Sequence, residues 1–429
     1  MTRQAILALS LMGYAFAMSG CAIAEQAFTQ QTADATPADA SAKLEAAFAD
    51  IVEMDARNIE RLIAITEIPA PTFSEEVRAA DFARRLEAIG GVSVEIDEVG
   101  NVLARRKGSG NGRTLALVAH LDTVFPAETD VTVRQEGNVY FAPGIGDDAR
   151  GLVVLLSLLE VMNKNDMATD DDILFIGSVG EEGLGDLRGV RHIFREDGPK
   201  IDNFIAIDGG TADRVVTEGV GSNRYRITYE GPGGHSYGAF GRAHPHQALA
   251  QAIINFTEAA TPITQSGPKA TFSVGRIGGG TSINSIPFKS WMEVDMRSED
   301  KDKLAELDVV FRASIQEALD TENDRRSRDE AITINVDQVG QRPVGRTDLE
   351  SSLVQNTKTA IESMGLTPQF LSSSTDSNMP MSLGIPAITM GKGGIGRNAH
   401  SPDESWENKD PHIAIQTLLL VVAAEANLQ

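Results

Sequence analysis

The stretch that decides the fold is ILFIGSVGEE, residues 173–182, in which a short apolar segment runs directly into two glutamates. The length and composition of residues 173–179 predict an interior β-strand. A carboxylate that follows such a strand lies in the crevice at the carboxyl end of an open α/β sheet, where these folds bind ligands. Glu181 and Glu182 are therefore candidate functional residues.

Other polar side chains follow predicted strand ends and turns in the same way. Residues 114–119 are uniformly apolar, which predicts a strand covered on both faces, and residues 204–207 form a similar run. An apolar stretch over 152–162 predicts a buried helix. Five polar residues follow these strands or lie in the associated turns, namely His120, Asp122, Asp147, Asp208 and His400.

The sequence changes character near residue 220. Tyr225, Ile227 and Tyr229 alternate with polar residues, which indicates an exposed sheet rather than a buried parallel one. The predicted order from there is strand, helix, strand, strand, helix, strand, which is that of a ferredoxin-like unit. We therefore expect an α/β catalytic domain (41–219 and 341–429) interrupted by an α+β domain (220–340).

Two local signals concern the helices near the amino terminus. Apolar residues at helical spacing predict one amphipathic helix over about 41–66. Thr72 with Glu75 three residues later has the pattern of a capping box, so a second helix is expected to start at Thr72.

The first residues predict export. One positive charge precedes an apolar run that is short for a bilayer span, so residues 1–24 are expected to be a signal peptide. The only cysteine, Cys21, follows Met18-Ser19-Gly20 and resembles a bacterial lipoprotein processing site, which predicts a periplasmic, lipid-anchored protein of the cell envelope. The alternative is cleavage after Ala24 and a soluble periplasmic protein. Residues 25–40 have the composition of a flexible tether.

The length of the chain predicts its number of domains, and its net charge argues against two kinds of binding partner. A chain of 429 residues predicts two domains. Its 38 Lys and Arg against 61 Asp and Glu give a net charge of −23, which argues against nucleic acid or an anionic membrane surface as a partner.

The candidate residues suit a centre with two metal ions. Two divalent ions about 3.5–4 Å apart acidify a water and stabilise the oxyanion of amide hydrolysis. Such a pair needs a bridging carboxylate, nitrogen and oxygen ligands on either side, and a further carboxylate as general base. The chain offers each of these parts.

The residues also resemble a known family, the M20 co-catalytic zinc metallopeptidases, which include peptidase T and glutamate carboxypeptidase. The resemblance covers about residues 55–425. Six ordered motifs carry it: VAHLDTV (118–124), GIGDDARG (144–151), GEEG (180–183), DGG (208–210), GGHS (233–236) and NAHSPDE (398–404).

The resemblance implies a role for each ligand. Asp147 would bridge two Zn²⁺ ions, for which Co²⁺ or Mn²⁺ could substitute. The other ligands would be His120 and Asp208 at one ion, and Glu182 and His400 at the second. Glu181 would be the general base, and Asp122 would orient His120.

The resemblance further implies substrate contacts and a homodimer formed through the inserted domain. His235 would stabilise the oxyanion, while Asn284 and Arg297 would hold the substrate, with Thr375 contributing from a later loop. Arg297 has alternative partners in Glu293 and Asp295 on the same strand face. Asp148, beside the bridging aspartate, is expected to cap the following helix.

Two departures from the family pattern affect the site. The lysine that usually stands two residues after the bridging aspartate is replaced by Ala149, and Arg150 follows. The loop at 372–377 keeps Thr375 but lacks the usual preceding glycine pair, which leaves the substrate class open.

The sequence thus predicts an exported dinuclear zinc exopeptidase acting on short peptides. Two related alternatives remain, an N-acyl-amino-acid amidohydrolase and a glutamate-type carboxypeptidase. A peptide-binding lipoprotein without catalytic activity is a third.

Overall fold

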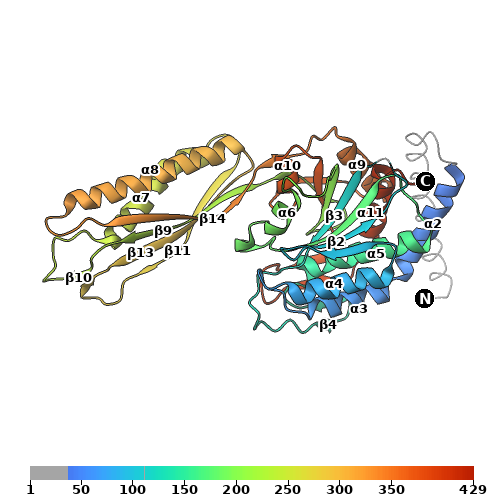
Figure 1. Cartoon of the computed structure of the whole chain (residues 1–429), viewed down its shortest axis with the longest axis horizontal. Helices are drawn as coiled ribbons and strands as arrows, with labels where there is room; N and C mark the ends of the chain where they lie inside the picture. Colours follow the sequence, from blue (N-terminus) through green and yellow to red (C-terminus); the bar gives the residue numbers. More distant parts are fainter. Residues whose placement is uncertain (1–36, 111) are drawn as a thin grey trace, which may run out of the picture. The chain divides into compact units, whose positions relative to one another are not determined.

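The computed structural model describes residues 37–110 and 112–429, and these divide into two compact units. Unit 1 contains the chain up to Glu218 and again from Arg346, whereas unit 2 is formed by residues 219–345 (Figure 1). The predicted signal peptide, Cys21 and most of the predicted tether lie outside the described residues. The last part of that tether, residues 37–40, is instead the first turn of a helix.

Unit 1 is built on a mixed sheet whose four central strands are parallel. The strand order is β1-β2-β6-β3-β7-β17-β8-β15, with β16 paired to β8. Strands β6, β3, β7 and β17 are parallel, whereas β1, β2 and β8 pair in the antiparallel direction. The bounds are β1 Ser93–Ile96, β2 Val102–Arg106, β3 Thr114–His120, β6 Asp172–Ser178, β7 Asn203–Ile207, β8 Arg214–Gly219, β15 Gly345–Arg346, β16 Gln369–Ser373 and β17 Ala387–Met390.

Helices cover both faces of this sheet, so the prediction for residues 114–119 is confirmed. Leu115 and Leu117 of β3 join the core formed with α2, α3, α4, α5, α9 and α11, whereas Ala116 and Val118 pack with α6 and α10. In the described part of the chain, no helix has the length and apolar character needed to cross a membrane. The helices are α2 Pro37–Glu53, α3 Asp55–Thr66, α4 Glu76–Ile89, α5 Arg150–Lys164, α6 Arg188–Ile193, α9 Ser352–Ser363, α10 Asn378–Ser382 and α11 His412–Glu425.

A second, smaller sheet of unit 1 has the order β18-β19-β5-β4. Its interior includes Trp406, which is 1% exposed and lies beside Tyr140. The loop between β18 and β19 carries His400. The strands are β4 Arg134–Glu136, β5 Val139–Phe141, β18 Ile395–Arg397 and β19 Ser405–Glu407.

Unit 2 has the predicted ferredoxin-like order of elements and its own core. The antiparallel sheet β11-β13-β9-β14 is covered on one face by α7 and α8 (Figure 1). Tyr225, Ile227 and Tyr229 of β9 are buried in that core, while Arg224 and Arg226 pair with acids of β13. The alternation predicted for this strand is therefore confirmed. The elements are β9 Gly221–Glu230, α7 Pro245–Thr264, β11 Ala270–Gly279, β13 Lys289–Ser298, α8 Lys301–Arg325 and β14 Thr333–Arg342, with a short β10–β12 ladder of Gly234–His235 and Ser285–Ile286.

Two of the predictions for the amino-terminal helices are wrong. The expected single helix over 41–66 is divided into α2 and α3 at Met54. The expected capping box does not form, because α4 begins at Glu76 and the side chain of Thr72 donates instead to Asp122. Both side chains of the apparent box have long-range partners, and these outweigh the local hydrogen bonds.

Arg78 joins α4 to the carboxyl end of β3. The residue is 1% exposed, and its guanidinium group donates to the carbonyls of Ile68 at 2.6 Å and Leu121 at 2.9 Å. A charged group is buried at this position because backbone carbonyls satisfy its N–H groups.

Arg78→Met is expected to lower the free energy of unfolding by about 2–4 kcal/mol, because it leaves buried carbonyls without a donor. Urea unfolding of the metal-free protein measures the change. Arg84→Met is the matched control on the same helix, since Arg84 is largely exposed and pairs with Asp81; about 0.5 kcal/mol or less is expected there. Equal losses in both variants would contradict the role of Arg78.

Candidate metal centre

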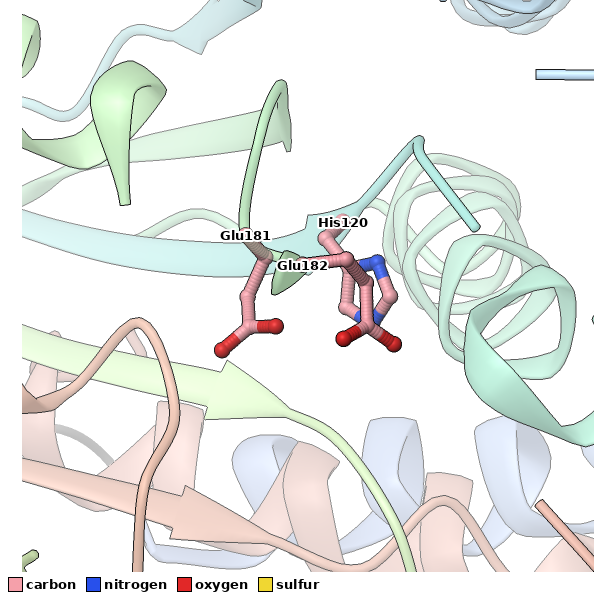
Figure 2. A group of neighbouring side chains, drawn as sticks. All are labelled: His120, Glu181 and Glu182. Atoms are coloured by element: carbon pink, nitrogen blue, oxygen red, sulfur yellow. The ribbon is translucent and has the colours of Figure 1, made fainter. Parts of the chain in front are cut away.

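The structure brings the predicted ligands together as two overlapping groups of three. His120, Asp147 and Asp208 form one group, and Asp147, Glu182 and His400 form the other. Within each group the candidate ligand atoms lie within 4.8 Å of one another. Glu181 belongs to a third group with His120 and Glu182, and Figure 2 shows these three side chains directed to the same side of the strand ends.

Asp147 is the member shared by the two groups, and its two oxygens face different partners. Its Oδ1 is 3.1 Å from Nε2 of His120, and its Oδ2 is 3.2 Å from Nε2 of His400. A carboxylate in this position can place one oxygen on each of two ions.

The parallel strands explain why most of these residues meet. His120 ends β3, Asp208 directly follows β7, and Glu181 and Glu182 follow β6, so neighbouring strands deliver all four at one edge. Asp147 lies in the non-helical turn before α5 and is joined to the next residue by a cis peptide bond. His400, in the loop between β18 and β19, has a positive φ of 65°.

Asp122 holds both the histidine and the glutamate pair. Nδ1 of His120 lies 2.9 Å from the backbone carbonyl of Asp122 and 3.6 Å from its Oδ1. The two carboxylate oxygens each accept an N–H at 3.0 Å, one from Glu181 and one from Glu182. Sequence reasoning assigned Asp122 to His120 and missed its contact with the loop of the candidate base.

A second carboxylate supports the same loop. Glu75 is 2% exposed, accepts the N–H of Gly180 at 3.0 Å and pairs with Arg188 at 2.6 Å. Thr72 donates its hydroxyl to Asp122 at 2.8 Å. The residues that imitate a capping box therefore position the turn that carries the two glutamates.

Glu404 is a supporting residue that sequence reasoning did not single out, although it closes the motif containing His400. It is 1% exposed, and its carboxylate accepts the N–H groups of Gly144, Gly146 and Asp147 at 2.8–2.9 Å. Burial raises its pKa to about 7, against the opposing effect of the N–H of Gly144. The carboxylate of Glu404, which belongs to the segment that contains His400, thus holds the backbone of the turn that carries Asp147.

Lys392 is a second residue that the sequence argument missed. It is 4% exposed, and its Nζ lies 3.1 Å from Oδ1 of Asp148, 3.6 Å from Asp208 and 3.8 Å from Asp147. The signal that could have found it is GKGG (391–394), which directly follows the short apolar strand β17. Lys392 thus supplies a cation next to the loop in which Ala149 replaces the usual lysine.

Asp148 is in contact with the start of the following helix, as expected, because its Oδ1 accepts the N–H of Gly151 at 3.2 Å. It also accepts the N–H of His120 at 3.2 Å and forms the ion pair with Lys392. Burial raises the pKa of Asp148 to about 7. Its contacts fix the backbone beside two of the candidate ligands.

The donor set fits divalent ions of the zinc type, which bind imidazole nitrogens together with carboxylates. Hydrogen bonds to Asp147 and Glu182, the latter at 2.7 Å, raise the pKa of His400 to about 10. Protonated His400 thus acts as a cation between two carboxylates. A divalent ion held there by the same three side chains would take over this positive charge.

The predicted substrate residues are divided between the two units, with His235, Asn284 and Arg297 in unit 2 and Thr375 in unit 1. His235 and Asn284 adjoin at the β10–β12 ladder, where the N–H of Ser236 donates to the carbonyl of Asn284 at 2.9 Å. Arg297 pairs with Asp295 at 2.7 Å, which is one of the alternative partners noted from the sequence. Thr375 is 3% exposed, and its hydroxyl bonds to that of Thr389 at 2.7 Å inside unit 1.

Glu404→Ala is expected to lower the free energy of unfolding of the metal-free protein by about 2 kcal/mol or more, because three buried N–H groups lose their acceptor. Thermal or urea unfolding measures it. Glu407→Ala, three residues later on β19, is the control, since the Glu407 carboxylate pairs with the half-exposed Arg397. An unchanged stability in the Glu404 variant would show that this carboxylate does not support the turn.

The chain is similar to known proteins in both sequence and fold. The sequence profile of peptidase family M20/M25/M40 matches residues 116–424. A putative LysW-lysine/LysW-ornithine hydrolase of Pyrococcus abyssi is 32% identical over 173 residues, which are 40% of this chain and 43% of the relative. A succinyl-diaminopimelate desuccinylase of Corynebacterium glutamicum is 23% identical over 237 residues, which are 54% of this chain and 64% of the relative. The matches thus span less than two thirds of these relatives.

Solved structures share the fold over nearly their whole length. Aminopeptidase PepT of Bacillus cereus ATCC 10987 superposes with a TM-score of 0.69 at 19% identity, covering 86% of this chain and 98% of that protein. The dipeptidase Dug1p of Saccharomyces cerevisiae gives a TM-score of 0.68 at 14% identity, covering 90% and 98%. With the profile match extending over most of the sequence, the chain belongs to peptidase family M20/M25/M40.

Proposed function

We propose that this chain is an exported dinuclear metallohydrolase that removes a terminal residue from short peptides. The observation that carries the proposal is the position of Asp147, whose two oxygens face His120 and His400 in separate ligand groups. The names of the similar proteins, which include an aminopeptidase, a dipeptidase and a desuccinylase, support hydrolysis of a peptide or acyl-amino-acid substrate.

The ligand groups would hold one ion each and share Asp147. When bound, two such ions supply an acidified water and stabilisation of the negative charge that develops on the substrate. Zn²⁺ suits the mixed nitrogen and oxygen donors, and Co²⁺ or Mn²⁺ could replace it.

Glu181 is the proposed general base. It is 5% exposed, its backbone N–H is held by Asp122, and it lies outside both of the ligand groups that contain Asp147. Its carboxylate would take the proton of the attacking water and pass it to the leaving amine, which is the task of a general acid and base in amide hydrolysis.

Residues of unit 2 are proposed to bind the substrate. Nδ1 of the exposed His235 accepts the N–H groups of Tyr237 and Gly238, so the neutral ring carries its proton on Nε2 and can donate to an oxyanion. Asn284 adjoins it at the β10–β12 ladder. We further propose that unit 2 acts as a lid and as the dimerisation domain, and that Arg297 binds a substrate carboxylate after leaving its partner on β13.

Glu181→Gln is expected to reduce kcat by about 100- to 10,000-fold while leaving metal binding intact, because it removes the base but no proposed ligand. Product analysis by mass spectrometry, with dipeptides, tripeptides and N-acyl amino acids, measures turnover and shows which end of the substrate is read. Glu98→Gln, an exposed carboxylate of unit 1, is the control and should retain full activity.

Metal content separates the possible outcomes of this experiment. Wild type and Glu181→Gln should each bind two Zn²⁺ per chain, and His400→Ala should bind one. Cleavage of N-acyl amino acids alone would favour the amidohydrolase, and release of a carboxyl-terminal residue would favour the carboxypeptidase. No cleavage by a wild-type protein that holds two ions would favour a peptide-binding lipoprotein.

The proposed location in the cell envelope rests on the amino-terminal sequence. We propose lipid anchoring through Cys21, the only cysteine of the chain. Cys21→Ser is expected to move the protein from the membrane fraction to the soluble periplasmic fraction after expression in a Gram-negative host. Unchanged fractionation, with a mature amino terminus after Ala24 in the wild type, would instead indicate ordinary signal cleavage.

A further inference from the structure

Lys392 lies inside the candidate metal centre without belonging to either ligand group. Its Nζ is 3.6 Å from Oδ1 of Asp208 and 3.8 Å from Oδ1 of Asp147, in addition to its 3.1 Å contact with Asp148. Two of these three partners are proposed ligands. A charged side chain so close to them affects any ion that binds there.

The ligand oxygens near the ammonium group of Lys392 face only one of the two ligand groups. Asp208 and Oδ1 of Asp147 face the group that contains His120, and these are the oxygens near the ammonium. The other group is formed by Oδ2 of Asp147 with Glu182 and His400. Within the described chain, no lysine or arginine forms an ion pair with Glu182.

The loop that carries Lys392 is held firmly in place. Arg150 is 1% exposed and donates to the carbonyls of Lys392 at 3.3 Å and Pro411 at 3.0 Å. The preceding Gly391 leaves no space for a side chain, because a Cβ there would lie 1.9 Å from the carbonyl oxygen of Thr211. The ammonium group therefore cannot be withdrawn by a simple movement of its backbone.

We propose that Lys392 makes the two metal sites unequal, weakening the site of His120, Asp147 and Asp208 relative to the site of Asp147, Glu182 and His400. The inference rests on the proposed dinuclear function. A fixed positive charge repels a divalent ion bound to the same carboxylates, and the low dielectric of a buried site strengthens that repulsion. Lys392 is thus a positioning residue, which acts on ion occupancy through the carboxylates that it contacts.

The test is a titration of metal-free protein with Co²⁺, followed by calorimetry and by visible absorption, which reports the coordination of each ion. Wild type is expected to bind two ions whose dissociation constants differ by about 10-fold or more. In Lys392→Met the weaker site should tighten by about 10-fold while the tighter site changes little. Lys392→Arg should restore the wild-type difference, and Lys409→Met is the control for loss of a lysine outside the centre.

A double variant guards against a folding defect. Lys392→Met leaves the buried Asp148 without its ion pair, so Lys392→Met with Asp148→Asn removes both charges together. This variant should also tighten the weaker site selectively, but by less than Lys392→Met, because the nearby negative charge of Asp148 is removed as well. Weakening of both sites in both variants would overturn the inference and show that Lys392 only supports the ligand arrangement.

The outcomes also separate this inference from the proposed function. Two ions of equal affinity, unaffected by Lys392→Met, would overturn the unequal sites and leave the dinuclear function standing. A wild-type protein that binds no divalent ion would overturn the dinuclear function and this inference with it.

Discussion

The crowding of carboxylates at one edge of a buried sheet is the constraint on which the rest of the centre depends. Asp122, Asp148, Glu181, Glu182 and Glu404 are each no more than 6% exposed. An ionised carboxylate is buried only where hydrogen bonds or positive charges compensate for the lost water. The groups that compensate each carboxylate differ between those that support the loops and those that are candidate metal ligands.

Two of the supporting carboxylates, Asp122 and Glu404, are compensated mainly by backbone N–H groups, whereas Asp148 also has the ammonium group of Lys392. Asp122 accepts two N–H groups, and Glu404 accepts three. Asp147 and Glu182 instead direct oxygens towards imidazole nitrogens. Backbone hydrogen bonds to Asp122 and Glu404 hold the loops. The carboxylates of Asp147 and Glu182 are therefore available to bind ions.

Much of the centre could be predicted because parallel strands deliver their following residues to one edge. The apolar runs before His120, Glu181 and Asp208 made those positions recognisable, and the fold class followed from the same runs. Glu404 and Lys392 were missed because Gly146 and Asp148, the partners that give them their roles, lie more than two hundred residues away in the sequence. The motif GKGG marks the position of Lys392 but does not show what its side chain contacts. The apparent capping box at residues 72–75 shows the reverse error, since a valid local pattern was overridden by distant partners.

The neighbouring positions of β8 and β15 have a consequence for how the inserted unit is accommodated. These strands are adjacent in the sheet of unit 1, and the N–H of Thr347 reaches the carbonyl of Thr217 at 2.9 Å. Residues 219–345 therefore leave the sheet at the end of one strand and return to it at the neighbouring strand, as the turn of a hairpin does. Since the entropy of closing a loop grows only slowly with its length, a whole domain with its own core can occupy a place that a few residues would fill. The sheet can in this way accept inserts of very different size without any change to its strand order.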